Sequence, residues 1–467
     1  MPIFSNKDYT EIRDPIYGFI KIPKVFLKII DSRAFQRLRW ISQLPLEQLI
    51  YPSAQHSRLE HSFGTMHLSF ISANSLCIND SEKLNSLFEN DSDFRSIHEG
   101  AHNSFILTAG LIGLLHDIGH SPYSHTLEDA LRYSNKNYAY NHEIVGYQII
   151  QKLFQKDFES SVYFTKALKV LNKTTPIGDL SGLEVLLRSM IDGYFDVDKG
   201  DYLLRDSYHC GVTYGIYDYQ RLWQNVIITE NNILGVKEKA AVELWKLRFS
   251  RFNMFQNVYN HHTRNITDAL LVEIIQKTIE QDISYVIPFK DPYNITGKEI
   301  QSFELWNDTE LIRNVLNLDD EYINKLVNYF IERKLYKRFL VLDFPIEDII
   351  KDKDGQGLKG YLQNIFDDIK SNLKYKHLSY LIQEKSLAPV QEEGITANKI
   401  ILKKDGTHVA ISEYFGFNVE NISRDKYSLH VFAKTPKDLE EKKDEIEKQL
   451  REQITRDSLI SWHRDIR

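Results

Sequence analysis

The chain has 467 residues, of which 42% are hydrophobic and 26% are charged. These values are ordinary for a folded globular protein, and the length exceeds one ordinary core, so we expect two or three domains, or one large helical domain with an appendage. The formal net charge of -7 argues against general coating of nucleic acid, although a local basic cleft can still hold a phosphate-bearing ligand.

Cysteine usage indicates a reducing compartment, and the hydropathy of the chain indicates neither a signal peptide nor a membrane span. Cys77 and Cys210 are far too few for a disulfide framework, and both stand in apolar surroundings. The N-terminal residues lack the apolar core of a signal peptide, and no apolar run approaches the length of a membrane span. We therefore expect a soluble cytoplasmic protein.

The N-terminal part of the chain combines turn chemistry with helical periodicity. It predicts, in order, an Asp-Pro-Ile-Tyr-Gly turn at 14–18, a strand at 19–22, helices at 25–44 and 55–76, and an insertion or mobile connection at 79–103. On the second helix Arg58 and His61 are three residues apart and share a face. That face pairs an anion clamp with a possible metal ligand.

The apolar run that ends at Leu115 contains no charge and predicts a buried helix. His116 and Asp117 follow directly, His120 comes one turn later, and Pro122 marks a helix end or restart. A buried His-Asp pair is costly unless each group has a partner, and one divalent metal partners both. For an isolated pair, a histidine capped by the neighbouring carboxylate is the simpler explanation, so the rest of the chain decides.

Two helices further along carry more polar candidates. His125 and Glu128 accompany a helix predicted at 127–131, and His142 opens another at 141–150. Lone histidines on such helices are more often satisfied core or surface groups than catalysts. Only convergence in one pocket would give these side chains a role.

Residues 196–209 form the second informative segment. One stripe of a helix there would hold Asp198, Tyr202, Arg205 and Asp206. An acid, a phenol, a guanidinium and an acid do not make a core face. A solvated salt-bridge face and a ligand-facing wall both fit this stripe.

The remainder predicts more helix and then a change of structural class. Helices are expected at 245–265 and 319–340, a linker at 351–357, short strands at 395–402, 407–412 and 427–433, and a closing helix at 436–453. We therefore expect a mainly α fold, with a helical domain over 1–350 and a small C-terminal α+β subdomain over 358–467.

Together, His61, His116, Asp117 and Asp198 make an H…HD…D pattern over three helices. This pattern resembles the HD-domain metal phosphohydrolases, whose helical core holds a divalent metal with those four side chains. Motifs between Asp14 and Asn265 further resemble the deoxynucleoside triphosphate triphosphohydrolases of the sterile-alpha-motif/HD type and their bacterial dGTPase-like relatives. The motifs lie at 14–18, 35–39, 58–62, 116–125 and 198–206.

The resemblance implies metal-dependent hydrolysis of deoxynucleoside triphosphates to deoxynucleoside and tripolyphosphate. It implies one divalent metal on the four residues of the pattern, with Mn²⁺, Mg²⁺ or Fe²⁺ favoured by mixed N/O ligation and Zn²⁺ or Ni²⁺ as alternatives. The implied catalytic residues are His120, His125, Glu128 and His142. The implied substrate contacts are Gln43, Leu44, Arg58, Lys199, Tyr202, Asp206, Arg251, Tyr259 and His261.

Within that resemblance, Tyr202 would lie under the sugar and reject a 2′-hydroxyl by steric conflict. The metal and Arg58 would polarise the α-phosphorus, and His120, oriented by Glu128, or else His142, would protonate the departing 5′-oxygen. Glu128 departs from the family, which has an aspartate as partner of the catalytic histidine. The extra methylene leaves the geometry of this proton relay open.

Asp31, Gln36 and Arg39 match positions where relatives bind a guanine nucleotide at a subunit interface. The resemblance therefore implies a homotetramer, a dimer of dimers, that GTP or dGTP activates. Ordinary helix-surface charges would explain Arg37 and Arg39 as well.

Two other interpretations stay open. An HD phosphodiesterase or 5′-nucleotidase would share the four metal ligands but would not need the residues expected to hold the sugar and outer phosphates. A nucleotide-sensing or nucleic-acid-binding regulator would use the same site structurally, although the intact ligand set and the net negative charge argue against it. The base of the substrate is not specified by these residues.

Overall fold

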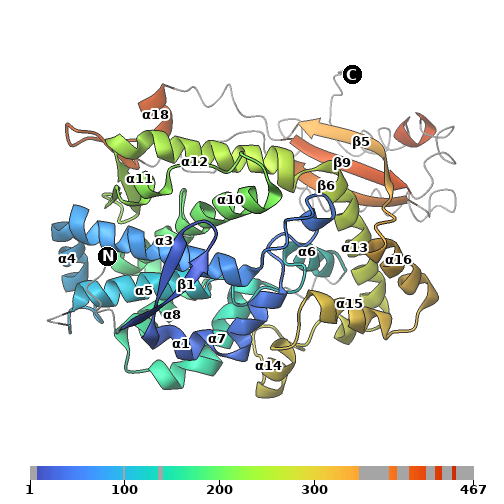
Figure 1. Ribbon diagram of the computed structural model, residues 1–467, viewed down its shortest axis with the longest axis horizontal. Coiled ribbons are helices and arrows are strands. Elements are labelled where there is room, and N and C mark those ends of the chain that lie inside the picture. The colour runs from blue at the N-terminus through green and yellow to red at the C-terminus, as the bar shows by residue number, and fades with distance from the viewer. Residues whose placement is uncertain are drawn as a thin grey trace.

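The computed structural model describes residues 8–97, 100–134, 140–345, 378–385, 399–416, 426–433 and 444–448. Helices make up most of these residues, and small sheets lie around them (Figure 1). The predicted mainly α fold is therefore confirmed. Within the described ranges, every helix is too short or too polar to cross a bilayer.

The helices are α1 Leu27–Ile30, α2 Arg33–Gln36, α3 Arg58–Asn79, α4 Ser81–Asn90, α5 Ala101–Leu115, α6 His125–Ser134, α7 His142–Phe158, α8 Val162–Leu171, α9 Gly182–Ile191, α10 Val197–Cys210, α11 Tyr219–Trp223, α12 Ala241–Met254, α13 His262–Gln281, α14 Gly297–Phe303, α15 Asp308–Leu316, α16 Glu321–Ile331 and α18 Ile411–Phe415. A π-helical turn, Phe255–Tyr259, joins α12 to α13. The strands are β1 Tyr9–Asp14, β2 Gly18–Pro23, β3 Val226–Ile228, β4 Leu234–Lys237, β5 Lys337–Pro345, β6 Leu378–Lys385, β7 Ile401–Leu402, β8 His408–Val409 and β9 Lys426–Ala433.

Helices α3 and α5 pack against each other at the centre of the fold. Helix α8 covers α5, and α10 covers α3. The second half of α5, from Phe105 to Leu115, is buried apart from Leu107. A helix without charge is stable here because neighbours cover it, rather than leaving one face to solvent.

The helices that carry the polar motifs begin at N-terminal capping residues. The Glu60 carboxylate accepts a hydrogen bond from the Ser57 N–H at 2.8 Å and so opens α3. The Asp196 carboxylate accepts from the Lys199 N–H at 2.8 Å and opens α10. Such caps satisfy the free N–H groups of the first turn and fix where each helix starts.

Two glycines allow neighbouring segments to approach closely around the polar motifs. A side chain at Gly64 on α3 would collide with Asp201 and Arg205 of α10. A side chain at Gly119 would collide with the backbone of α7 at the His142 carbonyl. Helix α10 can pack this closely on α3, and α7 on the loop at Gly119, only because these two positions lack a Cβ.

Three small sheets complete the described structure. Strands β1 and β2 form an antiparallel hairpin, and β5, β9 and β6 form a second sheet in that order. The third sheet has the order β3-β4-β7-β8, and β4 and β7 are parallel, with Val236 opposite Ile401. Strand β7 therefore joins a sheet of the helical part, while the predicted linker at 351–357 lies outside the described residues and the boundary at 350 stays a prediction.

Some predicted elements differ from the structure. One helix over 25–44 is wrong, because the chain turns between short helical pieces and is extended at Ile41. The described part of 79–103 is packed into the helical part rather than a loose connection, because α4 packs on α9 and Asp91 forms a buried ion pair with Lys166. The helix predicted at 319–340 stops with α16, and β5 follows it. Of the closing helix, residues 444–448 are described and are helical.

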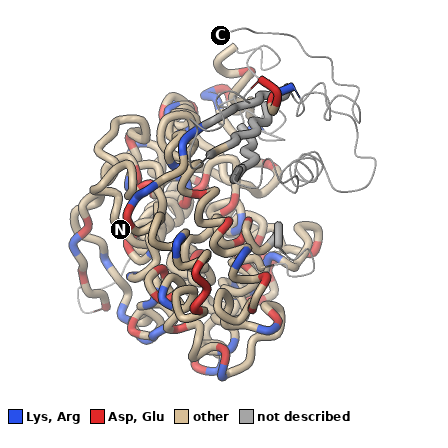
Figure 2. The backbone as a smooth tube through the Cα atoms, turned by 90° about the vertical axis from the view of Figure 1, so that its right-hand side faces the viewer, with Lys and Arg blue, Asp and Glu red and all other residues tan. Residues whose placement is uncertain are grey.

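Lys and Arg residues are interspersed with Asp and Glu residues over the described parts of the chain (Figure 2). This mixture agrees with the argument from net charge against a general nucleic-acid coat.

Candidate active site

A cavity of about 460 Å³ lies where α3, the loop after α5, α7, α10 and the π-helical turn meet. The predicted site residues that line it are Gln43, Leu44, Arg58, His61, His116, Asp117, His120, His125, His142, Asp198, Lys199, Tyr202, Asp206 and Tyr259. Residues from distant parts of the chain therefore converge in one place, which is what their individual assignments required.

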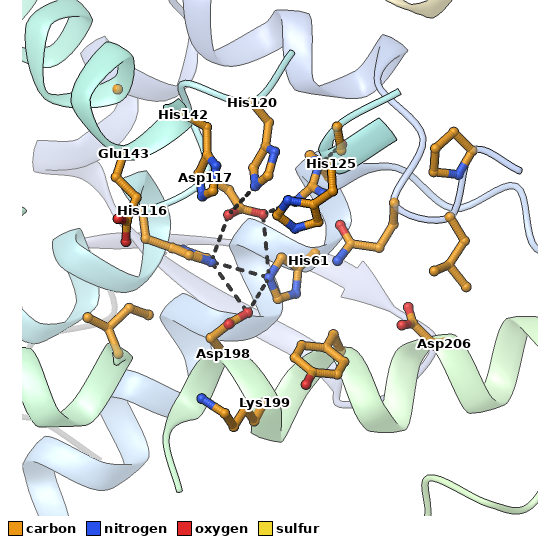
Figure 3. Close-up of a pocket in the computed structure, with 18 of the residues that line it drawn as sticks. His61, His116, Asp117, His120, His125, His142, Glu143, Asp198, Lys199 and Asp206 are labelled. Carbon is orange, nitrogen blue, oxygen red and sulfur yellow. Dashed lines mark hydrogen bonds and ion pairs between the residues drawn. The ribbon is translucent and has the colours of Figure 1, made fainter. Parts of the chain in front are cut away.

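Four side chains meet at one end of the cavity (Figure 3). The Nε2 atom of His61 lies 3.0 Å from Asp198 Oδ1 and 3.3 Å from His116 Nε2. His116 Nε2 also lies 3.3 Å from Asp117 Oδ1 and 3.6 Å from Asp198 Oδ1. The predicted H…HD…D set thus forms one compact donor cluster.

The two imidazoles of this cluster are held from behind. His61 Nδ1 pairs with Asp201 Oδ2 at 2.8 Å, and His116 Nδ1 pairs with the Gly113 carbonyl oxygen at 2.9 Å. Each ring therefore uses Nδ1 as a donor and turns Nε2 towards the centre, the arrangement usual for histidines that bind metal. Two ring nitrogens and two carboxylates facing one point require positive charge between them, so the donor set fits a divalent cation.

The pKa values of the cluster report the same demand for positive charge. Burial lowers the pKa of His61, but hydrogen bonds to the Asp198 and Asp201 carboxylates outweigh it and raise the pKa to about 10. Burial raises the pKa of Asp198, but its hydrogen bonds to His116 and His61 outweigh it and hold the pKa far below the usual range. A cation would replace the proton that His61 otherwise carries.

Asp201 was not predicted as a site residue, although it completes the cluster. Its carboxylate accepts hydrogen bonds from Arg205 Nε and Nη2, both at 2.9 Å, and from the Tyr17 hydroxyl at 2.9 Å. Arg205 in turn pairs with Asp14 at 2.8 Å. The 14–18 motif and Arg205 therefore support His61 from behind, and Arg205 is fully buried there instead of facing a ligand.

Arg58 lies beside the cluster and lines the cavity. Its Nη1 donates to Asp117 Oδ2, and its Nε donates to Ser124 Oγ at 2.9 Å. Its side chain is nearly buried. A guanidinium fixed in this way next to a cation site is suited to an anionic ligand such as a phosphate.

A group of three imidazoles borders the cluster (Figure 3). His120 and His142 stack with ring centroids 3.8 Å apart, and His120 Nε2 lies 3.3 Å from Asp117 Oδ1. Burial, together with the charge of Arg58, holds the pKa of His120 well below its usual range, so this ring stays neutral. His125 is largely exposed at the rim.

The expected pairing of Glu128 with His120 is wrong. Glu128 Oε1 accepts from His142 Nδ1 at 2.7 Å, and Oε2 lies 3.2 Å from His125 Nδ1. The Glu128 carboxylate reaches the first residue of α7 and also accepts from the His142 N–H at 3.2 Å. The acid therefore orients His142, while His120 is held by the stack and by Asp117.

The far end of the cavity is a cluster around Asp206. Its Oδ2 accepts from the Tyr259 hydroxyl at 2.6 Å, and its Oδ1 lies 2.8 Å from His56 Nε2. Tyr202 lines the wall between the two ends, and its ring lies 6.3 Å from that of Tyr259 in an edge-on arrangement. His56 was not assigned from the sequence, although it stands two residues before Arg58.

Three predicted substrate contacts are placed differently from their neighbours. Lys199 lines the cavity, but its Nζ is bound to Asp196 at 2.6 Å. Arg251 does not line the cavity and lies over the ring of Phe255, which does. His261 is also outside the lining and caps α13 by accepting from the Thr263 N–H.

The predicted activator residues lie at a different surface. Asp31 and Arg39 are exposed, and Gln36 Oε1 accepts from Arg39 Nη2 at 3.0 Å. Arg37 is not a surface charge, because it is 2% exposed and donates to the Trp306 carbonyl at 2.8 Å. Burial lowers the pKa of Arg37 to about 9.

The sequence matches the model of the HD domain over residues 58–175 and that of the HD associated region over residues 217–354. The chain is an HD-domain protein. The HD-domain match includes His61, His116 and Asp117 of the donor cluster, and Asp198 lies after it. Its relatives include an uncharacterized protein of Methanocaldococcus jannaschii, 32% identical over 343 residues, which cover 72% of this chain and 61% of the relative.

A second relative of this HD-domain protein is the deoxynucleoside triphosphate triphosphohydrolase SAMHD1 homolog of Dictyostelium discoideum. It is 24% identical over 428 residues, which cover 88% of this chain and 76% of the relative. The fold matches that of a phosphohydrolase from Bacteroides thetaiotaomicron with a TM-score of 0.67 and 23% identity, over 91% of this chain and 99% of the other. The HD domain and these relatives support an HD-domain phosphohydrolase.

Proposed function

We propose that this HD-domain protein hydrolyses deoxynucleoside triphosphates to the deoxynucleoside and tripolyphosphate, with one divalent metal ion. The observation that carries the proposal is a single cavity with phosphate chemistry at one end and sugar-binding chemistry at the other. The donor cluster and Arg58 lie at the first end, and Tyr202, Tyr259 and Asp206 lie at the second.

The residues for the phosphates would be His61, His116, Asp117 and Asp198 through the metal, with Arg58 and Lys199 beside them. A divalent cation bound there supplies charge to a phosphoryl oxygen and lowers the pKa of water. Mn²⁺, Mg²⁺ and Fe²⁺ suit this mixed donor set, and Zn²⁺ and Ni²⁺ remain alternatives to test. Arg58 could donate to the ligand while it keeps Asp117, since a guanidinium has further N–H groups available.

The proton for the departing 5′-oxygen would come from His142. Glu128 holds its Nδ1, and a ring nitrogen of His142 lies within 4.8 Å of an Asp117 oxygen. A histidine oriented by a carboxylate is a common general acid. His120 would act through position, because a neutral ring stacked on His142 limits how that ring can turn.

At the other end, Asp206 would receive the 3′-hydroxyl and Tyr202 would pack below the sugar, which favours a deoxyribose. Gln43 supports a polar ligand here, because its Oε1 is buried and has no hydrogen-bond partner among the described residues. Leu44 lies beside Gln43 in the lining. Arg251 and His261 would contribute only after side-chain movement from their present contacts.

We also propose regulation by a guanine nucleotide, GTP or dGTP, bound by Asp31, Gln36 and Arg39 in a homotetramer built as a dimer of dimers. Arg39 and Trp40, which is 66% exposed, line one surface pocket and offer a charge and an aromatic surface to such a ligand. Mass measurement with and without dGTP tests this; an unchanged, fully active monomer would refute it.

The main experiment incubates the purified chain with Mn²⁺ or Mg²⁺ and each deoxynucleoside triphosphate, with and without GTP or dGTP. Anion chromatography then identifies the phosphate product. Tripolyphosphate is the expected product. Turnover of monophosphates or diesters alone would replace the proposal with a general HD hydrolase, and no turnover with any metal would favour a binding protein.

A further inference from the structure

One carboxylate outside the cavity holds two of the loops that border it. Asp308, the first residue of α15, accepts from the Ser42 N–H at 2.9 Å through Oδ2 and from the Tyr123 N–H at 3.0 Å through Oδ1. Ser42 belongs to the loop before α3, and Tyr123 to the loop before α6. A single side chain therefore ties two loops that are far apart in the sequence.

The second loop contains a strained turn. Tyr123 and Ser124 have φ angles of +54° and +47°, in the left-handed region that residues with a Cβ rarely adopt. Two consecutive residues persist there only when surrounding contacts hold them. Within the loop, the Ser124 N–H donates to the Ser121 carbonyl at 3.0 Å. Asp308 supplies the contact from outside.

The strained turn sets the position of the phosphate-binding arginine. Ser124 Oγ accepts from Arg58 Nε at 2.9 Å, in a nearly buried contact. Because Ser124 follows Tyr123, a shift of the turn would carry Ser124 Oγ with it. The side chain of Arg58 would then lose its support opposite Asp117.

The first loop sets the backbone of the same arginine. Ser42 and Ser57 form an isolated antiparallel bridge, in which the Arg58 N–H donates to the Ile41 carbonyl at 3.0 Å. The Ser42 N–H is directed to the other side and meets Asp308. Asp308 therefore supports the segment that supports Arg58.

The short connector between α14 and α15, which contains Trp306 and leads into Asp308, contacts the loop from Ile118 to Ser124 at a second point, through Arg37. Arg37 donates through Nη1 to the Trp306 carbonyl at 2.8 Å and through Nη2 to the Ile118 and His120 carbonyls at 3.0 and 2.7 Å. Trp306 stands two residues before Asp308, within the HD associated region. Both ends of the loop from Ile118 to Ser124 thus depend on this short connector.

We infer that Asp308 is a positioning residue, which fixes the backbone and side chain of Arg58 for an anionic ligand. It acts from the HD associated region, so it gives that region a part in phosphate binding. This inference deepens the proposed function and rests on it for the phosphate that Arg58 would meet.

The substitution Asp308→Asn tests it. The amide keeps the size of the side chain but places an NH₂ group against one of the two backbone N–H groups, so one loop loses its acceptor. Calorimetry with inorganic tripolyphosphate and Mn²⁺ should show binding weaker by about tenfold, a size that coupled neighbours commonly produce. Glu310→Gln is the matched control, because Glu310 is on the same helix and pairs with Arg313 on the surface.

A double-mutant cycle separates positioning from general destabilisation. Ser124→Ala removes the acceptor for Arg58 Nε, so in that background only the route through Ser42 remains, and Asp308→Asn should weaken binding by clearly less than the roughly tenfold expected in the unaltered chain. Effects that multiply would overturn the inference. If Asp308→Asn does not fold, Asp308→Glu carries the same test, since it keeps both oxygens on a longer arm and should lose less affinity. Wild-type affinity in every folded Asp308 variant would also overturn it.

Failure of the inference and failure of the proposed function remain distinguishable. If the unaltered chain binds tripolyphosphate but turns over no deoxynucleoside triphosphate, the proposed function fails, while the binding cycle still supports or overturns the role of Asp308. If the unaltered chain does not bind tripolyphosphate at all, both fail.

Discussion

Asp201→Asn is the substitution that most directly examines how the metal cluster is built. Each oxygen of Asp201 accepts two hydrogen bonds: Oδ2 from His61 Nδ1 and Arg205 Nε, and Oδ1 from the Tyr17 hydroxyl and Arg205 Nη2. An amide has one acceptor oxygen, so its NH₂ group would face two of these donors in either orientation. His61 then loses either its partner or the rigid support of that partner.

The expected cost has two parts. Loss of a partner behind a metal-binding histidine usually lowers metal affinity about 10- to 100-fold, or roughly 1.4 to 2.8 kcal/mol. The folded state should also lose stability, but less than the roughly 3 to 5 kcal/mol seen when a buried ion pair is broken, because Arg205 keeps Asp14. Metal affinity and stability must therefore be measured separately.

Titration with Mn²⁺ followed by calorimetry gives the affinity, and thermal unfolding of the metal-free protein gives the stability. Asp206→Asn is the control, because Asp206 lies at the opposite end of the cavity and should leave Mn²⁺ binding unchanged. Mn²⁺ affinity in Asp201→Asn equal to that of the unaltered chain would refute the assigned role of Asp201.

Further predictions follow from the same contacts. His142→Ala should lower kcat by about 10²- to 10⁴-fold, as loss of a general acid does, and Glu128→Gln should lower kcat less. His125→Ala, at the exposed rim, should retain most activity. The reverse order in steady-state kinetics would contradict the assignment. Burial raises the pKa of Asp91, but the hydrogen bond from Lys166 outweighs burial and holds that pKa below its usual value. Asp91 therefore stabilises the fold above its unfolded pKa of about 3.9. It loses that contribution as the pH falls through the lower pKa of the folded state. Lys166→Met should then lower the free energy of unfolding by about 3 to 5 kcal/mol near pH 7 and flatten its fall in acid, and urea unfolding with an unchanged acid limb would argue against this. Chelation with EDTA should abolish turnover and lower the unfolding temperature, and adding Mn²⁺ should restore both. The reason is that a ligand at 100 times its Kd stabilises the folded state by about 2.7 kcal/mol. An unfolding temperature that does not change with metal would count against the cluster as a metal site.

The helical framework was predictable because its signals are local. The uncharged run before His116 can only be stable inside a protein, and the capping residues around Ser57 and Asp196 mark where helices begin. An adjacent His-Asp pair at the end of such a helix then required a partner. The resemblance to the HD-domain phosphohydrolases joined His61 and Asp198, on other helices, to this pair, and their role as metal ligands stays a prediction.

The partners of individual side chains were not predictable, because they depend on which helices approach and how closely. Periodicity grouped Arg205 with Asp198 on one stripe, but the contact of α10 with α3 at Gly64 buries Arg205 against Asp201. Glu128 has the right chemistry for a relay, and only the approach of α7 decides that it meets His142.

The sequence by itself therefore determined the helical class, because residue type and local spacing carry that information, and its resemblance to the HD-domain phosphohydrolases implied the four expected metal ligands. Only the tertiary structure decided that Arg37 is buried, that Asp201 stands behind His61, and that Asp308 holds two loops. These contacts join segments far apart in the chain. Their geometry comes from packing, which no local pattern records.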